Sequence, residues 1–111
     1  MTGKYVLHPA GKEQFHWDLK AGNGETILSS QMYASKQSAE VGIESCRTNS
    51  SKEAQFSKLV SKDSKPYFVL KAANGEPIGT SQMYASEATR DHGIASCKEN
   101  GPKGATQDDT K

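Results

Sequence analysis

The chain contains much of its sequence twice. Residues 19–49 align without a gap with residues 70–100 at an offset of 51, and 18 of the 31 aligned positions are identical. The best-matched stretches are LKAGNGE against LKAANGE, and SQMYAS, which is unchanged in both copies. A repeated unit of this kind buries its apolar face against its neighbour. The duplication therefore constrains the fold more than any other feature, although it does not identify a function.

Each copy has too little core material to fold well alone. A unit of about 50 residues buries too little surface to be more than marginally stable. Leu, Ile, Val and Phe make up only 16 of the 111 residues, but the net charge is +1, so the chain lacks the high charge that accompanies disorder. We expect the copies to share one core. We assign residues 1–50 to the first repeat and 51–101 to the second, and expect 102–111 to be a flexible tail.

Charge and hydropathy exclude several classes of protein. Fourteen Lys and Arg face thirteen Asp and Glu, so no overall field attracts nucleic acid or an anionic membrane. No apolar run is long enough to span a bilayer, and the N-terminus lacks the apolar stretch of a secretory signal. We expect a cytoplasmic protein, in a compartment where thiols stay reduced.

Apolar periodicity predicts three strands in each copy. Alternation over residues 15–21 places Phe15, Trp17 and Leu19 on one face of a half-buried strand. The predicted strands cover residues 5–8, 15–21, 25–30, 56–61, 67–72 and 77–81. The Asn-Gly pairs at 23–24 and 74–75 tolerate positive φ at both central turn positions, which favours tight hairpins.

A helix follows the strands in each copy. Ser35 and Ser86 are suited to cap the first turn, and the helices are expected to end near Asn49 and Glu99. Each helix contains a glycine, at 42 and 93, that costs about 1 kcal/mol relative to alanine. We attribute both glycines to close approach of the helix to the sheet.

These motifs carry a family resemblance. A β-β-β-α repeat with L-K-A-x-N-G-E, S-Q-M-Y-A-S and G-I-x-S closely resembles the YegP-like family of small bacterial proteins, over residues 4–100. The resemblance implies an α+β fold in which both copies build one continuous antiparallel sheet, with or without exchange of a terminal strand, and both helices cover one face. It supplies no activity and no functional residue. Cys46 and Cys97 replace a small aliphatic residue of that family, which favours a packing role for them.

No chemical motif stands out in the sequence. There is no CxxC, no phosphate-binding glycine loop, and no ligand spacing among the histidines at 8, 16 and 92. Cys46 and Cys97 could be a redox or metal pair, but buried packing is the preferred interpretation. We therefore predict no metal, no cofactor and no catalytic residue.

The best candidates for a surface site are polar and aromatic residues that occur in both copies and that folding alone does not explain. They are Lys20, Lys71, Gln31, Gln82, Tyr33 and Tyr84, with Tyr67 added from the same sheet face as the lysines. The two tyrosines of the SQMYAS motif are either aromatic platforms for a ligand or rings that pack beneath their helices. The open face of the sheet is either a solvated surface or a binding surface.

Three functions remain open. The favoured one is a small non-enzymatic binding or interaction module, with an unidentified partner that could be a protein. A weak nucleic-acid binder would use Lys20, Lys71 and Tyr67, and an enzyme would have to use His16 beside Asp18. Because the second copy occupies the place of a partner subunit, we expect a monomer whose repeats act as a pseudo-dimer.

Overall fold

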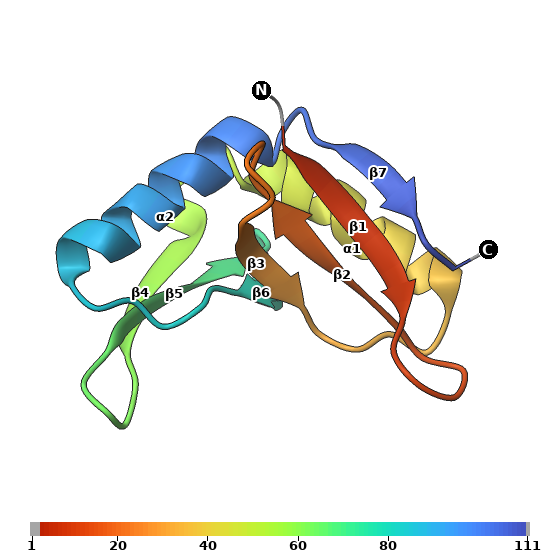
Figure 1. The fold of residues 1–111 in the computed structure, drawn as a ribbon, viewed down its shortest axis with the longest axis horizontal. Coiled ribbons are helices and arrows are strands. Elements are labelled where there is room, and N and C mark those ends of the chain that lie inside the picture. The colour runs from red at the N-terminus through yellow and green to blue at the C-terminus, as the bar shows by residue number, and fades with distance from the viewer. Residues whose placement is uncertain (1–2, 111) are drawn as a thin grey trace.

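The two repeats join through their third strands, which lie side by side at the centre of one sheet (Figure 1). A computed structural model describes residues 3–110. The strands are β1 (Lys4–Pro9), β2 (Phe15–Lys20), β3 (Thr26–Ser30), β4 (Phe56–Val60), β5 (Pro66–Lys71), β6 (Pro77–Thr80) and β7 (Ala105–Asp108), and the helices are α1 (Lys36–Asn49), α2 (Glu87–Asn100) and the short 3₁₀ helix η1 (Glu53–Gln55). The strand order is β4-β5-β6-β3-β2-β1-β7, and β3 pairs with β6. The predicted α+β architecture of two β-β-β-α repeats is confirmed.

The core lies between the sheet and the two helices. Trp17 and Leu19 of β2 and Phe68 and Leu70 of β5 are fully buried, as the alternation predicts. Aromatic rings meet edge to face within each half, with Tyr5 and Trp17 centred 5.4 Å apart and Phe56 and Phe68 centred 5.6 Å apart. The buried residues of both repeats belong to one cluster, so the two halves share a core.

The helices begin at the predicted caps. The Oγ of Ser35 accepts a hydrogen bond from the backbone N–H of Ser38, and the Oγ of Ser86 accepts one from that of Thr89. The buried face of α1 includes positions 39, 42, 43 and 46, which recur at the spacing of one helix face. Among residues 3–110, no helix has the length and apolar character needed to cross a membrane.

The C-terminal segment corrects one expectation. Residues 105–108, expected to lie in a flexible tail, form β7, which pairs in parallel with β1, so the sheet is mixed rather than wholly antiparallel. β7 follows α2 at the end of the second repeat and pairs with β1, the edge strand of the first repeat. The sequence did not predict this strand because its residues are polar and show no apolar alternation. It is held by backbone pairing, by an ion pair of Asp108 with Lys36 at 2.5 Å and by a hydrogen bond from Arg47 Nε to Gly104 O. Lys111 lies outside the described residues, as do residues 1–2 at the start of the first repeat.

The Asn-Gly hairpins differ in detail from the prediction. Only the glycines take positive φ, at 88° for both Gly24 and Gly75. The Oδ1 of Asn23 instead accepts a hydrogen bond from the backbone N–H of Glu25 at 3.0 Å, and Asn74 does the same for Glu76. The asparagine therefore shapes the loop through its side chain, as in an Asx turn.

Candidate functional site: a pair of clefts between the repeats

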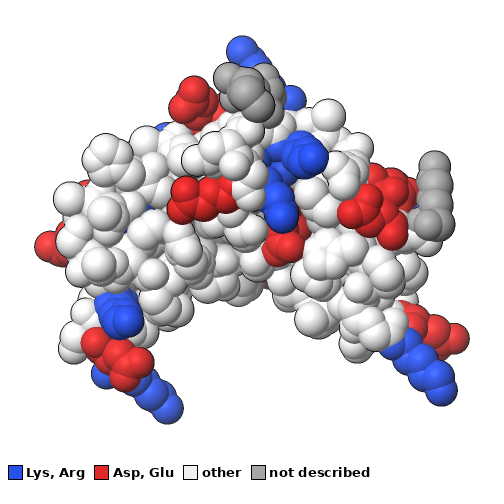
Figure 2. All heavy atoms as spheres, in the orientation of Figure 1, with Lys and Arg blue, Asp and Glu red and all other residues white. Residues whose placement is uncertain are grey.

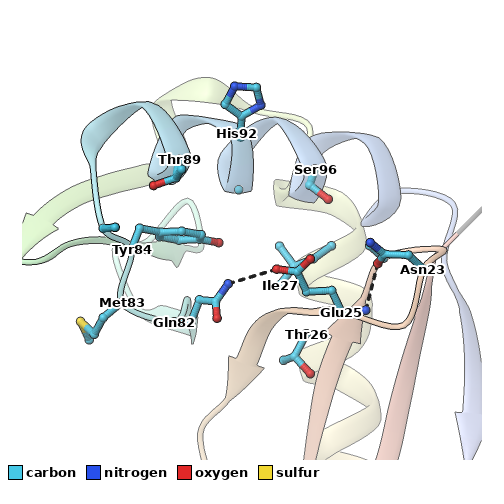
Figure 3. Close-up of a pocket in the computed structure, with 13 residues that line it drawn as sticks. Asn23, Glu25, Thr26, Ile27, Gln82, Met83, Tyr84, Thr89, His92 and Ser96 are labelled. Carbon is cyan, nitrogen blue, oxygen red and sulfur yellow. Dashed lines mark hydrogen bonds between the residues drawn. The ribbon is translucent and has the colours of Figure 1, made fainter.

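A cleft of about 480 Å³ separates the β2–β3 hairpin of the first repeat from α2 and the loop that precedes it (Figure 3). The hairpin side contributes Asn23, Glu25 and Ile27, and the other side contributes Gln82 and Tyr84 with the lower face of α2. The cleft therefore exists only when both repeats are folded against one another.

A smaller cleft of about 180 Å³ occupies the equivalent place on the other side of the molecule. It lies between the β5–β6 hairpin and α1, and each of its ten lining residues corresponds, at the offset of 51, to a residue that lines the larger cleft. Seven of these ten pairs are identical, namely Ala21/Ala72, Glu25/Glu76, Ile27/Ile78, Gln82/Gln31, Tyr84/Tyr33, Gly93/Gly42 and Ser96/Ser45. The pseudo-twofold symmetry of the chain thus produces two versions of one cleft.

The tyrosine of each SQMYAS motif reaches its cleft because the helix above it carries glycine. A Cβ at Gly93 would lie 2.2 Å from the Oη of Tyr84 and 3.1 Å from Phe68, and one at Gly42 would lie 2.2 Å from the Oη of Tyr33. From the sequence, we attributed both glycines to close approach of the helix to the sheet. The nearest neighbour is instead the tyrosine of the preceding loop, which lies directly under the helix.

The Tyr84 ring is partly packed and partly accessible. It stacks on Phe68 with ring centres 6.3 Å apart and planes inclined by 10°, and its backbone N–H donates to Pro66 O at 2.8 Å. Burial raises the pKa of the Tyr84 hydroxyl, and Gln82 opposes that rise. The two alternatives for this tyrosine are therefore compatible, since a ring backed by the core also lines the cleft.

Polar groups face one another across the larger cleft. The Nε2 of Gln82 donates to the Oε1 of Glu25 at 3.4 Å, which joins the two repeats (Figure 3). Among the described residues that line the cleft, Glu25 is the only one with a formal charge at neutral pH. The ring of His92 points away from Tyr84 and Gln82. The lining therefore offers one carboxylate, amides and hydroxyls beside an aromatic ring.

The clefts differ at three of the ten positions. Thr26 and His92 of the larger cleft correspond to Pro77 and Val41 of the smaller one, and Thr89 corresponds to Ser38. The larger cleft is accordingly the more polar of the two. The smaller cleft thus has the same frame with a more apolar lining.

The remaining candidate residues lie elsewhere. Lys20 and Lys71 end β2 and β5, and Tyr67 lies on β5, at positions that alternate with the buried residues and so face away from the helices. Because β3 and β6 separate β2 from β5, the two strands are about 14 Å apart at normal strand spacing. Figure 2 shows charges of both signs interspersed on the side in view, with no extended basic patch there. The three residues therefore do not gather into one site.

The cysteines belong to the core. Cys46 and Cys97 are fully buried and free. Burial raises the pKa of the Cys46 thiol to about 12, and burial together with the neighbouring Cys46 raises the pKa of Cys97 well above its usual range. Since the thiolate is the reactive form, these residues are packing elements, as the sequence suggested.

The sequence analysis named His16 beside Asp18 but missed that His8 belongs to the same cluster. The pairing of β1 with β2 places His8 opposite His16, with Asp18 next along the same face of β2. Burial lowers the pKa of His16, His8 lowers it further, and Asp18 acts in the opposite direction. The two histidines lie at equal distances from the first turn, which is a hint that they could face one another. Only the strand register shows that they do.

The fold and its clefts define a tandem α+β protein in which each repeat completes a cleft of the other. Both repeats match the family model described as a domain of unknown function, DUF1508, at residues 10–56 and 61–108. The chain belongs to the UPF0339 family, which includes YegP.

Relatives from other bacteria match nearly the whole chain. The UPF0339 protein of Shewanella oneidensis is 56% identical over 101 residues, which cover 91% of this chain and 92% of that protein. YegP of Escherichia coli K12 is 50% identical over 110 residues, covering 99% and 100%. Among solved structures, the solution NMR structure of a Shewanella oneidensis UPF0339 protein has a TM-score of 0.92 at 54% identity, covering 99% of this chain and 93% of that one. That of Escherichia coli YegP has a TM-score of 0.93 at 50% identity, covering 99% and 95%.

Proposed function

We propose that this protein is a small non-enzymatic binding module and that the larger cleft is its ligand site. The observation that carries the proposal is the matched pair of clefts, in which a hydrogen-bonding glutamine, a tyrosine and a glutamate recur at equivalent places. Folding explains the glycine beneath which each tyrosine lies. The amide and the carboxylate that face one another across the opening share only one long, exposed hydrogen bond at 3.4 Å, which is a weak reason for folding to require them.

Size and polarity favour the larger cleft as the site. A volume of about 480 Å³ lies within the range of roughly 300–1,000 Å³ typical of small-molecule sites, whereas about 180 Å³ lies below it. The larger cleft also has Thr26 and His92 where the smaller one has Pro77 and Val41. Together with the amide of Gln82 and the carboxylate of Glu25, the hydroxyls of Thr89 and Ser96 in its lining offer hydrogen bonds in addition to contact with the Tyr84 ring.

The chemistry of the lining suits a small organic cation. Glu25 supplies the charge, and the side-chain oxygens of Gln82 and Ser96 are further acceptors for an ammonium or guanidinium group. The exposed part of the Tyr84 ring can contact a cation or a planar group through its face. An anion would meet the Glu25 carboxylate without a described cationic side chain in the lining to balance it.

Two further expectations accompany this proposal. Binding without turnover is supported by the orientation of His92, whose ring points away from the Tyr84 hydroxyl, so this base is not aligned with a nucleophile (Figure 3). A cytoplasmic location is supported by the two free thiols, which persist in a reducing compartment.

An amide-resolved NMR titration of the full chain tests the proposal. The probes are arginine, putrescine and choline, with acetate and phosphate as anionic controls. We expect a cation to shift the amides of Glu25, Gln82 and Tyr84 in a saturable manner, while the anions leave them in place. Saturable binding of the anions alone, or no shift with any cation at millimolar concentration, would contradict the proposed ligand class.

The chain offers a matched control for the location of the site. Gln82→Ala removes the amide of the larger cleft, and Gln31→Ala removes the equivalent amide of the smaller one. We expect the first variant to weaken cation binding about tenfold, in line with the loss of about 1.4 kcal/mol for a hydrogen bond near a charge. The second should have no effect. Equal losses in both variants, or a loss only in Gln31→Ala, would place the binding elsewhere.

A further inference from the structure

We propose that His8, His16 and Asp18 form a binding site for one divalent transition-metal ion of the zinc class. The site lies on the face of the sheet that is turned away from the helices, and it is separate from both clefts. The sequence offered His16 and Asp18 only as the residues that an enzyme would have to use, and the family match assigns no role to any of the three.

Strand register brings the three side chains together. In the antiparallel pair of β1 and β2, His8 lies directly opposite His16, and Asp18 follows two residues later on the same face. Two rigid strands therefore supply all three groups, with His8 on one and His16 and Asp18 on the other. A site carried on paired strands keeps its geometry better than one on a loop.

The distances are close to those that a metal ion requires. One candidate ligand atom from each residue lies within 4.8 Å of those of the other two. The Nε2 of His8 is 3.0 Å from the Oδ2 of Asp18, and the ring centres of the two histidines are 3.8 Å apart. Tetrahedral bonds of about 2.0–2.2 Å place neighbouring ligand atoms roughly 3.3–3.5 Å apart. Small rotations of the side chains are enough to reach that arrangement.

A neighbouring strand orients the carboxylate. The Oγ of Ser29, on β3, donates a hydrogen bond to the Oδ1 of Asp18 at 2.6 Å, while the Oδ2 of Asp18 faces His8. One carboxylate oxygen is thus held by the protein and the other faces the imidazole. Such outer-shell hydrogen bonds are typical of metal-binding carboxylates and fix their orientation.

The set of donors selects the class of metal. Two imidazole nitrogens with one carboxylate oxygen suit Zn²⁺, Co²⁺ or Ni²⁺, whereas Mg²⁺ and Ca²⁺ prefer oxygen ligands only. Three protein ligands leave at least one coordination position for water or an external ligand. The side chains of His8 and Asp18 are 30% and 17% exposed, so solvent reaches the site.

The internal repeat provides a natural comparison. The positions equivalent to His8, His16 and Asp18 in the second repeat are Leu59, Tyr67 and Val69, which offer no imidazole or carboxylate. The proposal therefore predicts one metal ion for each chain, not two. If His8 and Asp18 form only an ion pair and bind no metal, no metal ion is expected for each chain.

Calorimetry with ZnCl₂ on the full chain, under reducing conditions and with MgCl₂ as the control ion, tests the site. We expect one equivalent of Zn²⁺ to bind, with amide shifts confined to β1, β2 and β3, and no saturable binding of Mg²⁺. His16→Ala and His8→Ala should each weaken Zn²⁺ binding at least about tenfold, and Ser29→Ala about tenfold through the orientation of Asp18. His92→Ala, which removes the remaining histidine, should leave the affinity for Zn²⁺ unchanged.

Several results would overturn the assignment. They are the absence of saturable Zn²⁺ binding below 1 mM, retention of binding in the double variant His8→Ala/His16→Ala, and loss of binding in His92→Ala. Equal affinity for Mg²⁺ and Zn²⁺ would also overturn it. A folded amide spectrum for each variant establishes that a lost site reflects lost ligands, and Asp18→Asn, which keeps the size of the side chain, serves if either alanine variant unfolds.

Discussion

Substitution of Gly93 by alanine should destabilise the protein even though alanine is the better helix former. An ideal Cβ at this position would lie 2.2 Å from the Oη of Tyr84, 2.7 Å from its Cζ and 3.1 Å from Phe68 Cε1. Because heavy atoms in contact prefer about 3.5–4.0 Å, the Tyr84 ring would have to move from its place beneath α2. An added group in a packed region costs about 1–3 kcal/mol.

The opposing effect is the gain in helix propensity, which is about 1 kcal/mol for alanine over glycine. We therefore expect Gly93→Ala to lower the free energy of unfolding by about 1 kcal/mol. In a Tyr84→Ala background the two closest contacts are gone and only Phe68 Cε1 remains, at 3.1 Å. The same substitution should then be neutral or stabilise the protein by up to about 1 kcal/mol. The sign of the effect thus depends on Tyr84.

Urea unfolding, followed by the fluorescence of Trp17, measures all four free energies of this double-mutant cycle. Trp17 is the single tryptophan of the chain and is fully buried. Thr48→Ala, at an exposed position of α1, is the control for helix propensity and should stabilise by a few tenths of a kcal/mol. If Gly93→Ala raised stability equally with and without Tyr84, contact with the tyrosine would not be the reason for glycine at this position.

Three further predictions concern the core and the C-terminal strand. Because burial raises the pKa of both thiols, Cys46 and Cys97 should resist a thiol-reactive dye at pH 8 until urea unfolds the chain, and rapid labelling of the native protein would contradict their burial. The ion pair with Lys36 lowers the pKa of Asp108, so its contribution to stability is present above the ordinary carboxyl pKa and is lost as the pH falls through the lowered value. In Lys36→Ala, an NMR titration should show that pKa moving back toward its ordinary value, and an unchanged pKa would refute the pairing. A fragment of residues 1–50 lacks both β6 beside β3 and β7 beside β1, so circular dichroism should show no cooperative unfolding, and a stable monomeric fragment would disprove the shared core.

Most of the secondary structure could be predicted from local patterns. Alternation located β2 and β5, serine caps located the starts of both helices, and the offset of 51 carried each assignment from one copy to the other. The observed ends of these predicted strands and helices differ from the predicted ones by at most one residue. These features depend on interactions between residues close in the chain, so the pattern of residue types is enough to reveal them.

The candidate site was only partly predictable. Internal identity selected Gln31, Gln82, Tyr33 and Tyr84, and all four line the two clefts. Identity also selected Lys20 and Lys71, which lie outside both clefts. They face away from the helices, and recurrence in both copies does not reveal which side of the sheet a residue occupies. Glu25 also recurs, as Glu76, but we did not select it because it belongs to the hairpin motif, whose recurrence folding explains. The structure places it at the opening of the larger cleft.

The amino-acid sequence determined the repeat, the alternating strands, the capped helices and the need for a common core, because these follow from local periodicity and from the amount of apolar surface. Only the tertiary structure decided how distant segments meet. It placed β7 on the edge of β1, closed each cleft with a hairpin from the other repeat and set His8 opposite His16. Strand order and register are set by packing over the whole sheet, so residues far apart in the chain acquire neighbours that no local pattern specifies.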